Sequence, residues 1–313
     1  LVAARHAQRR AHWLAACAAA CRPTATARAA TQPREIGPGP VEKQQWFTSV
    51  ELSGEHMFKS DTKNNNGDVS ISRAALEATV VYFVNDDVRL SLQLGTEYSH
   101  YSFKDTVLLP NTTSPFNDVY SDRIDPGISF KIDEHWSVLS TALIGFGGEE
   151  GAKASNSFRG GVIVAARYEF NKDLAVSGGI LATSRLEETA LIIPIIGIEW
   201  QINERLKLAS RGFGLNLTTK INDAWKFILS GEYQRRDYRL DESSPLPSGV
   251  IRDKRATIAG TFVYSLGKKV ELDLKLGAHV YQKFQADDSN GNEIATVKAK
   301  PGLFIGGGVT LRF

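Results

Sequence analysis

Few residues in this chain could carry out acid–base or covalent chemistry. Beyond residue 47 the histidines are His56, His100, His135 and His279, and they are widely scattered. The sequence has no G-x-S-x-G nucleophile motif and no H-E-x-x-H metal motif. His56 and His100 fall on the apolar side of their segments, where a hydrolase acting on membrane lipid would place a histidine, but no spacing selects a serine partner. We therefore expect interfacial histidines, no catalytic residue and no enzyme activity.

Two polar segments resemble calcium-binding loops in composition, DTKNNNGD at 61–68 and DDSNGNE at 287–293. A calcium loop of the EF-hand type needs an acid at its first position and a glycine at its sixth. That register places Thr62 or Ala286 first, so the requirement fails in both segments. We expect polar outward loops, with no metal and no cofactor.

Composition excludes several classes of protein. The 313 residues are 42% hydrophobic and 23% charged, and aromatic residues are too plentiful for a disordered chain. A membrane-spanning helix needs about 20 consecutive apolar residues. The longest apolar run, 190–198, is far shorter and contains Pro194, so a helical membrane protein is excluded. Cys17 and Cys21 are the only cysteines, which leaves no disulfide framework for the rest of the chain.

The first 32 residues differ from the rest and read as a secretory signal. Arg9 and Arg10 precede a short apolar stretch, and 27–29 provide small residues at an A-x-A spacing. A lipoprotein-type lipidation site at 14–17 and a disordered alanine-rich leader are the alternatives. Residues 33–46 then form a linker. Removing the five arginines of the leader from 37 basic residues leaves 32 against 35 acidic ones, which gives no support for nucleic-acid binding.

From residue 47 onward, apolar and polar residues alternate with period two, which predicts β-strands. In 88–98 and 270–280 leucines and valines occupy one parity and charges the other. Short Asn-, Asp- or Gly-containing turns recur, as in Val84-Asn85-Asp86-Asp87. We predict 14 strands, or 12 if the weak strand at 206–211 and its neighbour are misassigned. The predicted ranges are 48–58, 71–83, 88–103, 122–132, 136–148, 158–170, 174–186, 192–202, 206–211, 213–221, 226–240, 253–266, 270–284 and 301–313.

Four observations favour a transmembrane barrel over a soluble sheet. Tight turns alternate with longer connections, such as 104–121 and 285–299, and strands of 11–15 residues suit a tilted membrane crossing. The chain ends in an alternating strand that closes on Phe313. Aromatic residues gather near strand ends and predict two interfacial girdles. These are Phe83, Trp136, Phe170, Trp200 and Trp225 on the short-turn side, and Tyr98, Tyr101, Phe146, Tyr233 and Tyr281 on the other.

A barrel in hydrocarbon must be closed, because an unpaired sheet edge leaves backbone groups without partners. The polar parity then faces inward and lines a lumen. Fourteen strands lie between filled small barrels and open large ones, so a narrow pore and a lumen plugged by ion pairs both remain open. The predicted lumen-lining residues are Glu51, Glu55, Arg73, Glu77, Arg89, Gln93, Glu97, Asp125, Lys131, Arg167, Glu169, Glu199, Lys220, Lys226, Glu232, Arg255, Glu271, Asp273 and Lys275.

Three segments resemble a family of bacterial outer-membrane β-barrel proteins of uncharacterised function. They are LIIPIIGIEWQINERLKL (191–208), GLNLTTKINDAWKFILSGEYQRRDYRLD (214–241) and GLFIGGGVTLRF (302–313). The resemblance covers 47–313 and implies a barrel in the outer membrane of a Gram-negative bacterium. It implies no substrate and transfers no catalytic residue.

The expected fold is therefore an all-β, closed, antiparallel, up-and-down barrel, and the expected function is a passive, porin-like channel or small-solute transporter. A plugged structural or surface-interaction barrel is the alternative, and a barrel-embedded lipid hydrolase is a remote one. Expected partners are outer-membrane lipid and lipopolysaccharide, the assembly machinery through the strand ending at Phe313, and small solutes. The barrel is expected to be monomeric. A basic group at Arg235, Arg236, Arg239, Lys254 and Arg255 could attract anions or lipid phosphates, although a solvated rim is the reading we favour.

Overall fold

The computed structural model describes residues 45–63, 67–106, 108–109 and 115–313. The predicted leader at 1–32 and all but the last two residues of the predicted linker at 33–46 lie outside this part of the chain. The described strands are β1 (Trp46–Asp61), β2 (Asp68–Phe83), β3 (Val88–Lys104), β4 (Asp118–Lys131), β5 (Trp136–Glu149), β6 (Phe158–Asn171), β7 (Leu174–Arg185), β8 (Glu188–Gln201), β9 (Leu206–Ser210), β10 (Gly214–Lys220), β11 (Trp225–Arg239), β12 (Val250–Leu266), β13 (Val270–Asp287), β14 (Glu293–Ala299) and β15 (Gly302–Arg312).

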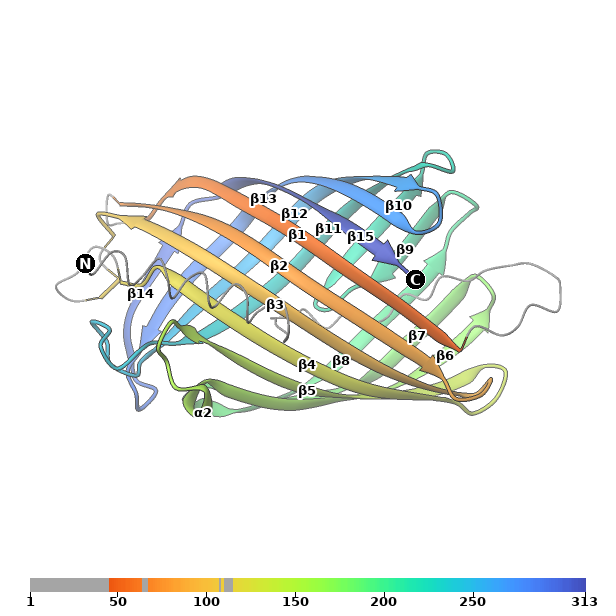
Figure 1. The fold of residues 1–313 in the computed structure, drawn as a ribbon, viewed down its shortest axis with the longest axis horizontal. Coiled ribbons are helices and arrows are strands. Elements are labelled where there is room, and N and C mark those ends of the chain that lie inside the picture. Colours follow the sequence, from red (N-terminus) through yellow and green to blue (C-terminus); the bar gives the residue numbers. More distant parts are fainter. Residues whose placement is uncertain (1–44, 64–66, 107, 110–114) are drawn as a thin grey trace.

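The strands form one closed antiparallel barrel (Figure 1). Neighbours in sequence pair with each other from β1 to β13, and β1 pairs with β15 through nine residue pairs from Ser49↔Arg312 to Met57↔Phe304. Both β14 and β15 pair with β13, so they occupy one position in the wall on either side of Pro301. The wall therefore has 14 positions. The weak strand predicted at 206–211 is present as β9, so the count of 14 is confirmed over 12.

The connections differ at the two ends of the barrel, as predicted. The short-turn end holds six tight turns together with Trp46 and Phe313. The long-loop end holds the remaining connections, including one that carries the four-residue helix α2 (Ala154–Ser157). The prediction of a long connection at 285–299 was wrong, because β13 continues to Asp287 and pairs there with β14. Among the described residues there is no helix of the length and apolarity that crossing a membrane requires.

Five of the tight turns use the same side-chain device. In each, one Asn or Asp side-chain Oδ1 accepts hydrogen bonds of 2.7–3.0 Å from the backbone N–H groups two and three residues later. This local bonding explains why these residue types start the turns. The residues are Asn85, Asp133, Asn171, Asn203 and Asn222.

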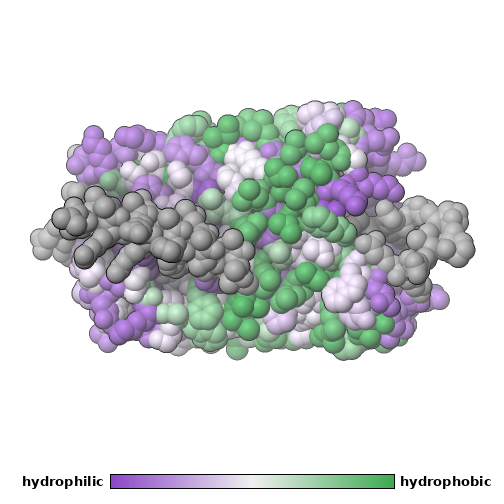
Figure 2. Space-filling view, viewed as in Figure 1, coloured by the Kyte–Doolittle hydropathy of each residue, from purple (hydrophilic) through white to green (hydrophobic). Residues whose placement is uncertain are grey.

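The apolar parity faces outward. Leu90, Leu272 and Leu274 are 42%, 38% and 49% exposed, and Figure 2 shows a hydrophobic band around the middle of the visible face between two hydrophilic ends. A soluble barrel would bury this parity, so the band is the surface that meets lipid tails. At the short-turn end, aromatic pairs border the band. Their ring centroids lie 4.4–4.8 Å apart in Trp46–Tyr82, Trp136–Tyr168 and Trp225–Tyr264.

Two aromatic residues of the predicted girdles lie on the other face. Tyr101 is fully buried inside the barrel, and Phe83 shares the lumen face with Arg89, whose guanidinium lies 5.5 Å from the Phe83 ring centroid. Position near a strand end did not decide the side; the parity of each residue along its strand did. Both residues have the odd parity of the inward-facing set on β2 and β3.

Candidate functional site: the barrel lumen

The lumen changes character along its length. On β3, inward-facing Glu97 and Tyr101 near the long-loop end are buried, whereas Gln93 and Arg89 nearer the short-turn end are partly exposed. The inward parity of β2 and β4 shows the same change. The lumen is therefore accessible from the short-turn end and packed shut toward the long-loop end over these strands.

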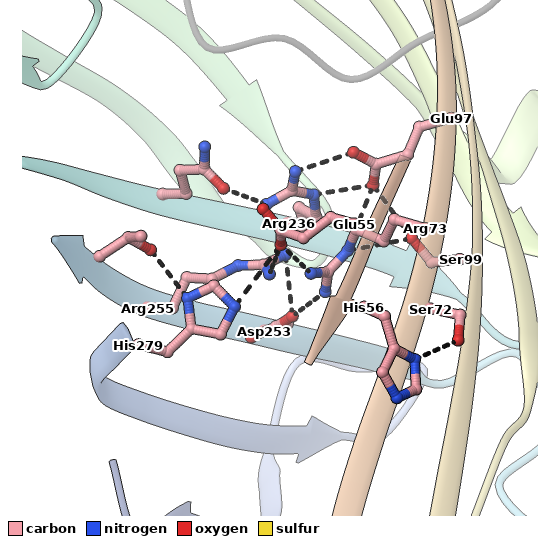
Figure 3. A network of polar contacts seen from close by, with 12 residues as sticks. Glu55, His56, Ser72, Arg73, Glu97, Ser99, Arg236, Asp253, Arg255 and His279 are labelled. Atoms are coloured by element: carbon pink, nitrogen blue, oxygen red, sulfur yellow. Dashed lines mark hydrogen bonds and ion pairs between the residues drawn. The ribbon is translucent and has the colours of Figure 1, made fainter. Parts of the chain in front are cut away.

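Arg73 of β2 is the centre of the packed region (Figure 3). Its guanidinium lies 3.0 Å from Asp253 Oδ2 and 3.8 Å from Glu97 Oε1, and it donates to the Tyr101 hydroxyl at 3.0 Å. The Tyr101 hydroxyl in turn donates to Asp253 Oδ2 at 2.8 Å. Burying a charge is costly unless other groups pair with it, and here one cation has the Tyr101 hydroxyl and three acids, the third being Glu55 at 3.4 Å.

A second arginine crosses the lumen. Arg236 of β11 donates to both carboxylate oxygens of Glu97 on β3, each at 2.8 Å. Six steps around the 14-position wall separate β11 from β3, so this pair spans the barrel interior from nearly opposite sides. A two-point arginine–carboxylate pair fixes geometry as well as charge. The contact closes the lumen at this level.

Glu55 of β1 extends the network toward β12 and β13. Its carboxylate lies 3.4 Å from Arg73, 3.8 Å from Arg255, 3.6 Å from Lys275 and 3.6 Å from the His279 ring. We refer to the connected set as the lumen cluster. It consists of Glu55, Arg73, Glu97, Arg236, Asp253, Arg255, Lys275 and His279.

An apolar seal adjoins the lumen cluster on the long-loop side. The rings of Tyr101, Phe103, Phe116 and Phe284 have centroid separations of 4.8–6.2 Å and are all buried. Phe116 belongs to the connection between β3 and β4, which also supplies the buried Leu108 and Leu109. Aromatic rings and leucines packed in this way exclude water, so the inner wall of β3 and β13 is apolar at this level.

The structure places the other predicted lumen residues in smaller groups nearer the short-turn end. Several make ion pairs of 2.5–3.4 Å with partners on the same strand, on a neighbouring strand or on the next strand beyond it. These groups are Glu77–Arg123–Asp125, Glu169–Arg167–Glu199–Lys207 and Lys226–Glu271–Arg312. They line the wall and, unlike Glu97 and Arg236, join residues near one another in the wall.

The remaining predicted residues lie elsewhere along the inner wall and at its short-turn rim. Glu232 accepts from Gln234 Nε2 at 2.6 Å, and Arg89 packs on Phe83. Lys131 and Lys220 lie at the short-turn rim, where Lys220 is 2.7 Å from Asp223. Glu51, Gln93 and Asp273 lie on the inward parity of β1, β3 and β13.

Sequence reasoning missed several members of the packed region. Asp253 and Arg123 lie on the inward parity of strands that were correctly predicted, so the same rule would have found them. Arg236 was grouped only with the basic rim, whereas Arg255 was also predicted to line the lumen, and both belong to the lumen cluster. Arg235 and Arg239 are also paired, with Glu188 at 2.8 Å and Glu187 at 2.5 Å, so a solvated rim is the wrong description of this group.

The two outward-facing histidines, His56 and His100, do not share one catalytic relay. On the outer face His56 Nδ1 lies 2.9 Å from Ser72 Oγ, as Figure 3 shows, while the Asp118 carboxylate is 2.8 Å from His100. Serine and acid thus contact different histidines, whereas a catalytic triad runs through one. Within the described ranges no group of three His, Cys, Asp or Glu residues could hold a metal ion.

Fold and site together define a class of protein: a 14-stranded transmembrane β-barrel with an apolar exterior and a charged, partly closed lumen. Residues 126–311, more than half of the chain, match the family described as "Domain of unknown function (DUF6268)", and the chain belongs to that family. No curated protein matches the chain.

Several solved structures share the barrel architecture. The COG4313 outer membrane channel from Pseudomonas putida F1 is 12% identical, with a TM-score of 0.49, covering 89% of this chain and 100% of that one. A Pseudomonas aeruginosa FadL homologue is 11% identical, with a TM-score of 0.47, covering 86% and 90%. The P. putida toluene transporter TodX is 8% identical, with a TM-score of 0.43 and the same two coverages.

Proposed function

We propose that the protein is a passive channel for small solutes in the bacterial outer membrane. The observation that carries this proposal is the accessible, charge-lined short-turn half of the lumen. Its inward residues, such as Glu77 with a side chain 32% exposed, border space that solvent can enter. A filled structural barrel would have no reason to keep charged side chains around an accessible interior.

The lumen cluster then acts as the constriction of the channel. Glu97 and Arg236 meet across the lumen, and Arg73 holds Glu97 and Asp253 together. Charged side chains at a constriction select solutes by charge and size. Mixed acids and bases here favour neither anions nor cations.

A plugged structural barrel is the second candidate, and the apolar seal specifically favours it. Tyr101, Phe103, Phe116 and Phe284 close the axis beyond the lumen cluster. In that case the outward loops would serve contacts with partners, and no solute would pass.

Planar-bilayer conductance separates the two candidates. The refolded protein should show ohmic single-channel steps, and the double variant Glu97→Gln/Arg236→Gln should show larger ones, because the cross-lumen pair is then uncharged. The matched control is Lys153→Gln/Glu242→Gln, which removes an exposed loop pair 2.6 Å apart and should leave conductance unchanged. Correctly folded protein that stays silent in all three forms would refute the channel and support the plugged barrel.

The remaining expectations belong to the same proposal. The barrel is inserted by the assembly machinery through its last strand, which ends at Phe313, and functions as a monomer among lipid and lipopolysaccharide. In support, Phe313 is 61% exposed, and its N–H donates to Thr48 O at 2.9 Å beside the first strand.

A further inference from the structure

The barrel wall is interrupted between β8 and β11. The two strands are 14 and 15 residues long, but the β9 and β10 hairpin between them has strands of only 5 and 7 residues. β8 pairs with β9 only at Glu199–Gln201, and β11 pairs with β10 only as far as Glu232. We call the interval above this hairpin the seam. On the β8 side it comprises residues 189–197, which among the described residues have no strand partner on that side.

β8 has the sequence of an edge strand along the seam. The Gln201 N–H points toward the β7 side, where it donates to Asp173 O, and the Ile198 N–H points the other way, where it donates to Ser210 Oγ. Even-numbered residues therefore direct their backbone groups at the seam. Pro194 is one of these even-numbered residues, and it has no N–H group that would be left unpaired. Proline in a sheet is found at such edge positions. The neighbouring Ile196 is 82% exposed.

The inner wall beside the seam is apolar, in contrast to the charged wall of β1 to β4. Leu181 of β7 pairs with Ile193 of β8 on one side and with Ile163 of β6 on the other, so the three side chains share the inward face. Leu191 and Ile195 flank Ile193 on that face. Leu191 stays partly exposed ten residues from the short-turn end of β8, the level at which Arg73 of β2 is buried. The accessible lumen therefore extends along an apolar wall to the seam.

Among the described residues, side-chain contacts join β8 to β11 and β12 at the upper end of the seam, where β11 also pairs with β5 at Arg239↔Gly148. The Glu188 carboxylate at the start of β8 lies 2.8 Å from Arg235 of β11 and 3.5 Å from Arg252 of β12. In the turn before β8, Glu187 pairs with Arg239. Ion pairs can exchange partners without breaking a backbone ladder. This part of the wall can therefore widen while the 14-position ladder below it stays intact.

We propose that the seam is a lateral portal through which uncharged, apolar molecules pass between the lumen and the hydrocarbon of the bilayer. The proposal rests on the proposed channel function and assigns it a substrate class and a route. The apolar seal narrows the axis, and an apolar solute passing along the charged wall would have to desolvate the charges of that wall. Beyond the Arg167–Glu199 ion pair, the inner wall on the way to lipid is apolar, so this last part of the transfer needs no desolvation of charge.

The test asks whether lipid reaches the inner face beside the seam. Single cysteines replace Ile193, on the inner face at the seam, Ile196, on the outer face, and Ala75, on the inner face of β2, after Cys17→Ser and Cys21→Ser. Ala75 is the matched control, because it is eight residues from the short-turn end of its strand, as Ile193 is, and has paired strands on both sides. Each cysteine carries a bimane fluorophore, and the vesicles contain phosphatidylcholine with a doxyl-labelled acyl chain.

The doxyl chain should quench bimane at Ile193 several-fold more than at Ala75, and to an extent comparable with Ile196. Heat-modifiable gel migration confirms that each labelled barrel is folded. Quenching at Ile193 no greater than at Ala75, in folded barrels that conduct, overturns the portal and leaves the channel standing. Absence of conductance even after the Glu97→Gln/Arg236→Gln substitution overturns the channel itself, whatever the quenching.

Discussion

Neutralising Glu97 should destabilise the barrel by about 3–5 kcal/mol, the usual cost of removing one partner of a buried ion pair. The Glu97 side chain is 7% exposed and accepts two 2.8 Å hydrogen bonds from Arg236, and it lies 3.8 Å from Arg73. Without this carboxylate the two guanidinium groups lose the acid they share. Asp253 and Glu55 then remain for Arg73, but Arg236 keeps only its hydrogen bond to Gln234 among the contacts described.

A double-mutant cycle separates this pairing from general disruption. Arg236→Gln alone should cost a similar amount, because it leaves Glu97 short of its main partner. The double variant Glu97→Gln/Arg236→Gln should cost less than the two single variants together, by about 1–3 kcal/mol. Two neutral amides can face each other across the lumen without a buried, unpaired charge.

The free energies come from urea titration of refolded protein in lipid vesicles, followed by tryptophan fluorescence and checked by heat-modifiable gel migration. The cycle on Lys153 and Glu242 is the control, since both side chains are 62% exposed and exposed pairs contribute under about 1 kcal/mol. A coupling energy across the lumen no larger than in this control would refute the assignment of Glu97–Arg236 as the main closure.

Four further predictions follow from packing, turns, pH and the lipid face. Gly179→Ala should destabilise the barrel by about 1–3 kcal/mol in the urea titration, because the added Cβ would lie 2.2 Å from Val164 O. Gly178→Ala is the control and should be tolerated, because no atom lies within 4 Å of its added Cβ. Asn222→Ala removes two 2.9 Å turn hydrogen bonds and should cost about 1–2 kcal/mol; an unchanged urea midpoint would contradict this role. Backbone N–H groups of Trp136 and His135 lower the pKa of Asp133, so the stability that Asp133 contributes is present above its unfolded pKa and lost as pH falls through the folded value. The urea midpoint of the wild type should therefore fall relative to that of Asp133→Asn as the pH is lowered from neutral to strongly acidic. Urea midpoints of the two proteins that change in parallel with pH would refute the turn assignment. Leu276→Arg on the outer face should cost about 2–4 kcal/mol in vesicles if it lies near the bilayer centre, and a neutral result would contradict lipid contact there.

Local pattern was enough to predict the strands, the tight turns and the inward parity. Even the five-residue β9 could be assigned from sequence, because its alternation and its Asn203 turn are local signals. The same parity rule, applied to every strand, would have placed Arg123, Asp253 and Tyr101 in the lumen. Those omissions reflect incomplete use of the pattern rather than missing information.

The closure of the lumen could not be predicted in this way. Glu97 and Arg236 are 139 residues apart, and their contact depends on which strands face each other across the closed barrel. The seam likewise depends on the length of β9 and β10 relative to their neighbours. Alternation shows which side of a strand is inward, but it carries no information about the residue opposite.

The sequence by itself determined the antiparallel order of the strands and the side that meets lipid, and it limited the number of strands to 14 or 12. Each of these follows from alternation and turn chemistry within a few residues. Tertiary structure alone decided that opposite walls meet through Glu97 and Arg236, that Phe116 and its neighbours seal one end, and that the wall opens between β8 and β11. The physical reason is that these features arise from closing the sheet on itself, which brings together residues that no local pattern relates.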